Sequence, residues 1–240
     1  MGYNADDVPP PSRSQRESRD KGALFGRRRS IVCCDKMATS TATSTGITLK
    51  GSVKTVTEFF EYSINNILYQ REIYPPETFR RVAKYGLAMF VTTDDGLTGY
   101  LSNVLAQMQE WLTHGTVQKL VLAITSQETG ETLERWVFDL QAEANLGPEE
   151  RVDKPDKEIQ AEIAAIQRQI TASVTFLPLN DEPCAFDLLV YTNEDVDVPK
   201  AWEESDPKLI VNSDEVRLRS FTTKVHKVDA SVSYRTDAGV

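Results

Sequence analysis

Histidine and cysteine are scarce in this sequence, which leaves few of the groups that a catalytic or metal site requires. The chain has two histidines and three cysteines in 240 residues. It contains no CxxC pair, HExxH helix, Walker-type phosphate loop, GxGxxG turn or GxSxG elbow. We therefore expect a non-enzymatic protein with no catalytic residues, no metal site and no cofactor.

The remaining polar groups offer one weak enzymatic alternative. His114 falls at the end of an expected helix and His226 in an expected strand, where a lone histidine is usually a satisfied structural residue. A hydrolase that uses dispersed residues would draw on Ser220 and His226. Neighbouring carboxylates such as Asp94-Asp95 are typical of helix caps and solvated surfaces rather than of cation sites.

Long apolar runs and an excess of basic residues are also absent. No run approaches the roughly 18 residues that span a bilayer, and the first thirty residues lack a signal-peptide pattern. The 27 Lys and Arg against 36 Asp and Glu give a net charge of -9, which disfavours nucleic acid and membrane as partners. The low cysteine count fits a reducing compartment, so we expect the nucleus or the cytoplasm.

The length and the 40% apolar share predict one globular domain with a tail. Residues 1–36 carry Pro9-Pro10-Pro11 and the cluster Arg27-Arg28-Arg29, with almost no apolar periodicity. We interpret residues 1–45 as a disordered extension. Met37, followed by a Ser/Thr/Ala stretch, looks like a second natural start, so residues 1–36 are either an extension of the protein or not part of its mature form.

Three segments have the apolar periodicity of amphipathic helices. The first follows Ser52, a candidate cap, and the second follows Thr93-Asp94-Asp95. Their apolar stripes are Val53, Val56, Phe60, Ile64, Ile67 and Leu68, then Leu97, Tyr100, Leu101, Val104, Leu105, Met108, Trp111 and Leu112, and finally Ile159, Ile163, Ile166 and Ile170.

Apolar runs between and after the helices predict strands. Residues 120–124 and 133–140 form a buried hairpin, and residues 173–179 and 185–192 form two further strands. Residues 82–91 are interpreted as a short helix followed by a strand. The order helix, helix, hairpin, helix, hairpin predicts the α+β class, with helices packed on an antiparallel sheet.

The last fifty residues contain a break in strand alternation. Residues 193–214 are polar, with Trp202 the one large aromatic residue, and a strand-like pattern resumes at Val216. The parity of the apolar positions changes between Phe221 and Val228, which a bulge or two separate strands would explain. The segment is either an ordinary hairpin or a mobile flap that pairs at more than one sheet edge.

Several blocks of sequence, in a fixed order, resemble one known family. From Gly46 to about Tyr234 the chain is similar to the HORMA-domain checkpoint proteins of the mitotic-arrest-deficient-two family. The blocks are GITLKGS at 46–52, EFFEYSINNILYQREIYPPETF at 58–79, VQKLVLAI at 117–124, LERWVFD at 133–139, RQITASVTFLPL at 168–179, FDLLVYT at 186–192, WEES at 202–205 and VRLRSFTTKVHKV at 216–228.

The resemblance implies a HORMA fold over residues 46–234, in which three helices back an antiparallel sheet, followed by a tail at 235–240. It implies that residues 193–234 are a safety belt with two placements. In the open form the belt occupies the sheet edge, and in the closed form it crosses the sheet and traps a partner peptide. Residues 46–50 would be a short strand that moves. The belt residues of interest are Trp202, Val216, Leu218, Phe221, Val225, His226 and Val228.

The resemblance also implies two interaction surfaces. The peptide-binding edge is the strand that carries Phe186, Leu188, Val190 and Thr192, to which a partner adds as a strand. The surface between open and closed molecules would comprise Arg168, Gln169, Thr175 and Phe176. Without the resemblance, Arg168 would be an ordinary helix-surface residue and Phe176 part of the sheet core.

The implied function is a spindle-assembly checkpoint at kinetochores, the spindle, the nucleus and the cytoplasm. The implied partners are the mitotic-arrest-deficient-one coiled-coil anchor, the cell-division-cycle activator of the anaphase-promoting complex, other subunits of the mitotic checkpoint complex, and an AAA+ ATPase with its adaptor. Open and closed conformers would also self-associate. A meiotic-axis or DNA-polymerase-subunit relative with the same fold is the alternative.

Overall fold

The structure, a computed structural model, describes residues 29–34, 49–142, 154–193 and 196–236. Most of the predicted N-terminal extension and the last four residues therefore lie outside the described residues. Within the extension, however, Arg29–Cys34 forms strand β1. The prediction that this part of the extension is disordered is wrong, because its backbone pairs with strand β6 (Cys184–Asn193) at the edge of the main sheet.

Three helices form from the three amphipathic stripes: α2 (Leu49–Gln70), α3 (Asp95–Thr113) and α4 (Asp156–Ala172). Asp94 caps α3 as predicted, since its Oδ1 accepts from the backbone N–H of Leu97 at 2.6 Å. Ser52 does not cap α2, because that helix begins at Leu49. The expected strand at 46–50 is also wrong for Leu49 and Lys50, which are helical, while residues 46–48 lie outside the described residues.

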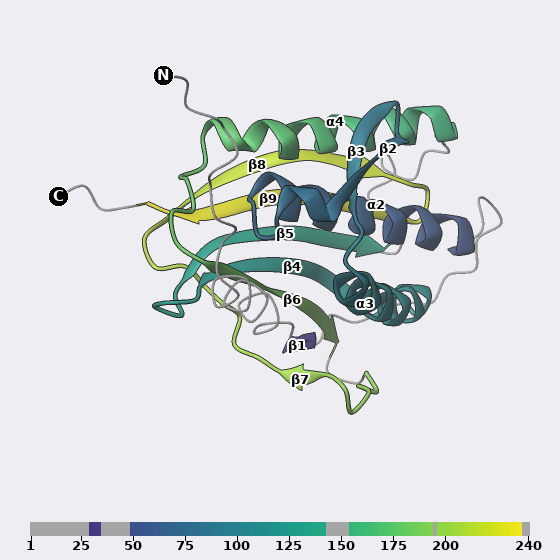
Figure 1. Cartoon of the computed structure of the whole chain (residues 1–240). Helices are drawn as coiled ribbons and strands as arrows, with labels where there is room; N and C mark the ends of the chain where they lie inside the picture. Colours follow the sequence, from purple (N-terminus) through teal and green to yellow (C-terminus); the bar gives the residue numbers. More distant parts are fainter. Residues whose placement is uncertain (1–28, 35–48, 143–153, 194–195, 237–240) are drawn as a thin grey trace, which may run out of the picture.

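Seven strands form one twisted sheet, in the order β7-β1-β6-β4-β5-β9-β8 (Figure 1). The strands between β6 and β8 pair antiparallel, which confirms the α+β class and the predicted hairpin of β4 and β5. At the other end, β1 pairs parallel with both β6 and β7. The remaining bounds are Val117–Ser126 (β4), Thr132–Ala142 (β5), Cys184–Asn193 (β6), Glu203–Glu204 (β7), Ser213–Thr222 (β8) and His226–Arg235 (β9).

The main core lies between the sheet and the three helices. Its centre is an aromatic cluster in which Phe59 and Phe60 of α2 lie 5.6 and 5.8 Å from the ring of Phe138 on β5. All three rings are fully buried. Burying each stabilises the fold by about 1.5–3 kcal/mol. A smaller cluster on the opposite face of the sheet comprises Val121, Ala123, Val137, Leu189 and Tyr191.

The segment after α2 differs from the prediction of a helix and a strand. After a turn of 3-10 helix at Pro76–Thr78, a separate two-stranded sheet forms from β2 (Phe79–Lys84) and β3 (Leu87–Thr92). Tyr85 and Gly86 both have positive φ, 53° and 69°, as a two-residue hairpin turn requires. The strands pack on α2, where the ring of Tyr69 stacks on Phe90 at 3.8 Å.

The strand predicted at 173–179 is also wrong. Ser173–Thr175 continues α4 as a turn of 3-10 helix, and the Ser173 hydroxyl donates to the carbonyl of Ile170 at 2.7 Å. Phe176 is 42% exposed, so it is not part of the sheet core. None of the helices in the described part of the chain is long and apolar enough to cross a membrane.

Candidate functional site

Strand β6 presents the edge that the resemblance singles out. Its residues Phe186, Leu188, Val190 and Thr192 are buried, and the first three belong to the main core beneath the helices. One side of β6 pairs with β4. The other side pairs with β1, in a register that sets Arg29 opposite Leu188 and Cys34 opposite Asn193. This edge therefore holds an added extended segment through its backbone, as strand-addition sites do.

The segment after β6 folds back over that added strand. Its β7 residues, Glu203 and Glu204, pair with Ser30 and Ile31, so β1 is enclosed between β6 and β7. Just before β7, Trp202 is buried with its ring 4.9 Å from Trp111 of α3. This aromatic pair anchors the start of the belt to the helical layer.

The belt then crosses the outer face of the sheet, opposite the helices. The carbonyl of Pro207 accepts from Arg135 Nε at 3.1 Å, and Arg135 Nη2 donates to the Tyr191 hydroxyl at 2.9 Å. Lys208 Nζ lies 3.9 Å from a carboxylate oxygen of Asp187 on β6. These contacts join the belt to β5 and β6 on the face of the sheet that carries the smaller apolar cluster.

The belt ends in the β8–β9 hairpin at the opposite side of the sheet, where β9 pairs with β5 and α4 runs along β8 (Figure 1). The ring of Phe221 packs 4.8 Å from Phe59. β8 ends at Thr222 and β9 begins at His226, so two separate strands explain the parity break. The hairpin also contains a register shift, which lies earlier, between Arg217 and Ser220. All seven belt residues named from the sequence are buried or half-buried against the domain.

A buried polar cluster ties this hairpin to the first helix. The Ser52 hydroxyl lies 2.6 Å from Thr223 Oγ1 and 2.7 Å from His226 Nδ1, and the His226 backbone N–H donates to Thr223 Oγ1 at 2.8 Å. Burial lowers the pKa of His226 to about 4, so its imidazole is neutral at physiological pH. The sequence analysis missed Ser52 and Thr223 as partners of this histidine. Ser52 lies 171 residues from Thr223 and 174 from His226, so no local pattern joins it to them.

The hydrolase alternative finds no support in this geometry. Ser220 is exposed on β8, whereas the imidazole of His226 is buried and bonded to Ser52, so the two do not form a nucleophile–base pair. Burial raises the pKa of the Cys184 thiol to about 11, which keeps that thiol protonated. Within the described ranges, no group of three His, Cys, Asp or Glu side chains is placed to hold a metal ion.

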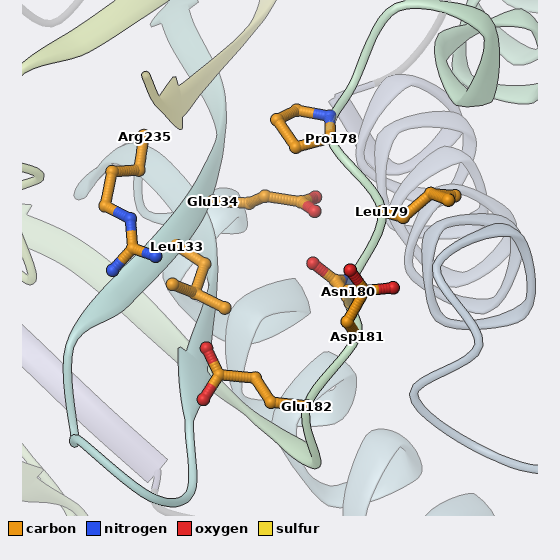
Figure 2. Close-up of a pocket in the computed structure, with 8 residues that line it drawn as sticks. All are labelled: Leu133, Glu134, Pro178, Leu179, Asn180, Asp181, Glu182 and Arg235. Atoms are coloured by element: carbon orange, nitrogen blue, oxygen red, sulfur yellow. The ribbon is translucent and has the colours of Figure 1, made fainter. Parts of the chain in front are cut away.

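A cavity of about 70 Å³ opens beside the end of β5, lined by Leu133, Glu134, Arg235 and residues 178–182 (Figure 2). Three of its side chains are carboxylates, and Leu179 at its rim is 79% exposed. A site this small and acidic is far below the size of ordinary ligand pockets, roughly 300–1,000 Å³. We assign it no binding role.

The four residues implied for the open-to-closed surface lie at the end of α4 and just after it. Arg168 and Thr175 are exposed. Gln169 Oε1 accepts from the backbone N–H of Arg219 at 2.7 Å, and the ring of Phe176 lies 6.5 Å from Tyr234. The end of α4 is therefore an accessible surface coupled by direct contacts to the belt hairpin.

Comparison with known proteins identifies the family to which this fold belongs. A family model described as the HORMA domain matches residues 52–226. The chain thus belongs to the HORMA-domain family. It is 60% identical over 199 residues to the mitotic spindle assembly checkpoint protein MAD2A of Dictyostelium discoideum and 54% identical over 200 residues to that of Homo sapiens. Each match covers 83% of this chain and 98% of the relative.

A solved structure supports the same grouping. A chain in the crystal structure of the mitotic checkpoint complex is 45% identical, with a TM-score of 0.72, over 78% of this chain and 99% of that chain. Within the HORMA family, the chain accordingly belongs to the MAD2 spindle-checkpoint proteins, rather than to the meiotic or polymerase-subunit alternatives. Its role is in the spindle assembly checkpoint of mitosis.

Proposed function

We propose that this chain acts in the checkpoint by switching from an open to a closed form that traps a partner peptide beside β6. The observation that carries the proposal is the enclosure of an extended strand between β6 and β7 by a belt that leaves one sheet edge and ends on the other. The described form corresponds to the closed placement, since the β8–β9 hairpin lies against β5 and the outer side of β6 pairs with an added strand rather than with the hairpin.

The geometry explains how a short peptide is held for a long time. Backbone hydrogen bonds along β6 supply affinity without a catalytic group, and side-chain pockets along the strand supply selectivity. The belt covers the ligand strand through the Trp202–Trp111 pair and the bond from Arg135 to Pro207. Release then requires these contacts to open locally, which lowers the dissociation rate.

The proposed partners follow from membership of the MAD2 group. We infer that the trapped segments belong to the mitotic-arrest-deficient-one anchor at kinetochores and to the cell-division-cycle activator of the anaphase-promoting complex. Capture of the activator delays anaphase, and an AAA+ ATPase with its adaptor resets the closed form. The protein acts without catalysis of its own, in the nucleus and cytoplasm and on the spindle.

Deleting Thr223–Val240 should leave a folded helical core but abolish stable capture of a synthetic activator peptide. The deletion removes β9, which joins the belt to β5, and it removes His226. Fluorescence anisotropy of the labelled peptide would measure the dissociation rate, and deletion of residues 236–240 alone is the control. Trp202→Ala, which leaves the sheet intact, should speed release at least about tenfold. Unchanged release by both variants would contradict trapping by the belt.

Arg168→Ala should weaken association of open with closed molecules about tenfold while leaving peptide affinity unchanged. Arg168 is exposed at the end of α4, away from the β6 edge, and exposed arginines are common binding hot spots. Sedimentation velocity measures the association. Lys157→Ala, exposed at the other end of α4, is the matched control. Equal association by the Arg168 variant and the parent would remove this surface from the proposal.

A further inference from the structure

The strand enclosed beside β6 is not a partner but part of this chain. Residues 29–34 pair with residues 188–193 in six consecutive positions without a register shift. On its other side the same strand pairs with Glu203 and Glu204 of the belt. The segment thus occupies the position that the proposed function gives to a partner peptide.

We propose that Arg29–Cys34 is a ligand carried in cis, which competes with partner peptides for the β6 edge. The inference rests on the proposed function, because it assigns an internal occupant to the same site. It adds a regulatory property to this chain: the closed form can assemble around its own N-terminal segment before any partner arrives.

The sequence of the segment suits the position. Arg-Ser-Ile-Val-Cys-Cys contains neither proline nor glycine, and its centre is the β-branched pair Ile31-Val32. Six extended residues span about 20 Å, the length of an ordinary strand. The run is bounded by Arg27 and Arg28 before it and by Asp35 and Lys36 after it, so the apolar part is limited to the length that pairs.

The connection to the domain is long enough to allow pairing in cis. Fourteen residues, 35–48, separate β1 from α2. An extended chain of that length reaches about 45–50 Å. The main sheet has seven strands and therefore six spacings, so its whole width is only about 29 Å. The connection is longer than the sheet is wide. Linkage through a connection of this length typically gives an effective concentration of about a millimolar, so even a weak internal ligand competes well.

The apparent affinity of a partner peptide depends on how often the internal strand occupies the β6 edge. If the internal strand fills the edge nine-tenths of the time, a partner peptide binds with an apparent Kd raised about tenfold. A chain that begins at Met37 lacks the segment and escapes this competition. The full chain would therefore need a higher concentration of partner peptide for capture than the Met37-start chain, although both contain the same HORMA domain.

The first test uses the segment itself as the probe. A fluorescent peptide of residues 27–36, kept reduced, is titrated into the Met37-start chain and into the full chain. We expect saturable binding to the Met37-start chain and an apparent Kd at least about tenfold higher for the full chain. Equal affinity for the two chains, or no binding to the Met37-start chain, would overturn the inference.

A point variant checks that strand pairing is responsible. Ile31→Pro in the full chain should restore probe binding to the Met37-start level, since proline removes a backbone N–H and is excluded from interior strands. Arg19→Pro, ten residues before β1, is the matched control and should bind like the parent. If Ile31→Pro also binds like the parent, the segment does not compete through β1.

A second probe separates this inference from the proposed function. The Met37-start chain is titrated with a synthetic activator peptide. If the activator peptide binds and the 27–36 probe does not, only the internal-ligand inference is wrong. If neither binds, the proposed function is contradicted as well. A full chain whose edge is filled only at concentrations where it sediments as a dimer would place a second copy there and overturn the pairing in cis.

Discussion

Replacing Arg71 with methionine should lower the free energy of unfolding by about 3–5 kcal/mol, because it leaves a buried carboxylate without its counter-charge. Arg71 and Glu134 are 4% and 2% exposed, and Arg71 Nε donates to Glu134 Oε1 at 2.7 Å. Urea denaturation followed by tryptophan fluorescence would measure the loss.

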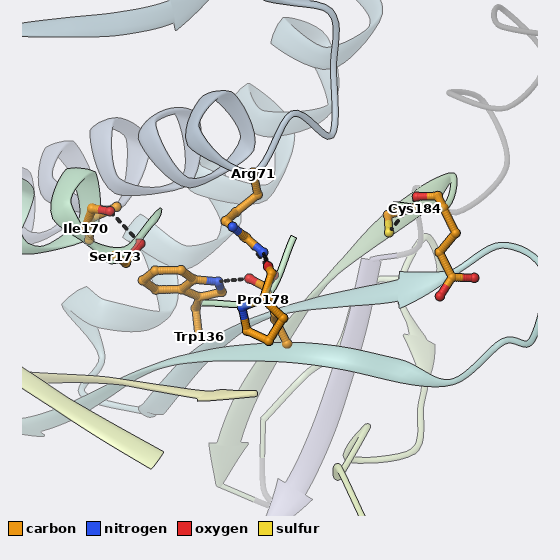
Figure 3. A network of polar contacts seen from close by, with 8 residues as sticks. Arg71, Trp136, Ile170, Ser173, Pro178 and Cys184 are labelled. Atoms are coloured by element: carbon orange, nitrogen blue, oxygen red, sulfur yellow. Dashed lines mark hydrogen bonds and ion pairs between the residues drawn. The ribbon is translucent and has the colours of Figure 1, made fainter. Parts of the chain in front are cut away.

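The pair is the centre of a network that joins three elements (Figure 3). Trp136 Nε1 donates to the second oxygen of Glu134 at 3.1 Å, and Arg71 Nη2 donates to the carbonyl of Pro178. Through these bonds the end of α2 is fixed to β5 and to the loop before β6. Losing the guanidinium therefore also leaves the Pro178 carbonyl without that donor.

Two variants control this prediction. Arg235→Met breaks an ion pair with Glu131 at the end of the same sheet, but these side chains are 36% and 63% exposed, so the cost should be below about 1 kcal/mol. The double variant Arg71→Met with Glu134→Gln should recover much of the loss, because the neutral amide can still accept from Trp136. If Arg71→Met alone were as stable as Arg235→Met, the role of Arg71 as the counter-charge of buried Glu134 would be contradicted.

The helices and the central hairpin could be predicted because their burial follows one simple period. Every third or fourth residue of α3 from Leu97 to Leu112 faces the same core, and Asp94 supplies a local cap. The runs in β4 and β5 are buried on both faces of the sheet, in the main core on one face and in the smaller cluster on the other. In these elements local propensity and tertiary burial agree.

Where the prediction failed, long-range contacts override the local pattern. In β2 and β3 both faces are partly exposed, so no clean alternation marks them, and the turn places Tyr85 at a positive φ that tyrosine rarely adopts. Residues 173–179 are rich in strand-forming types, yet Leu177 is buried while Val174 and Phe176 are exposed. The conformation of Ser173–Thr175 is set by the helix α4 that they continue, and not by their own strand propensity.

At the candidate site the sequence located the β6 edge and the belt only through a family resemblance. The signal for β1 was present, since Ile31, Val32, Cys33 and Cys34 form a short apolar run. The charged and proline-rich residues before it favoured disorder instead. A four-residue run acquires its meaning only from the strand it pairs with, and that strand lies more than 150 residues away.

Acidification should loosen the belt hairpin through His226. A histidine whose folded pKa is lowered from 6.5 to about 4 by burial gives stability that is complete above pH 6.5 and is lost as the pH falls toward 4. At about 1.36 kcal/mol per pKa unit, moving from pH 7.5 to pH 5 should cost on the order of 2 kcal/mol. Release of a captured activator peptide should then be roughly thirtyfold faster if the hairpin opens before the core.

His226→Gln is the control for this prediction, because its amide can bond Ser52 but does not titrate. Its release rate should change little between pH 7.5 and pH 5, a window above the ordinary pKa of most carboxyl groups. The hairpin is the part that should respond, since the imidazole accounts for one of the two buried bonds from Ser52 to the belt. Parallel pH profiles of parent and variant would mean that another group governs release, and that the buried imidazole does not hold the belt closed.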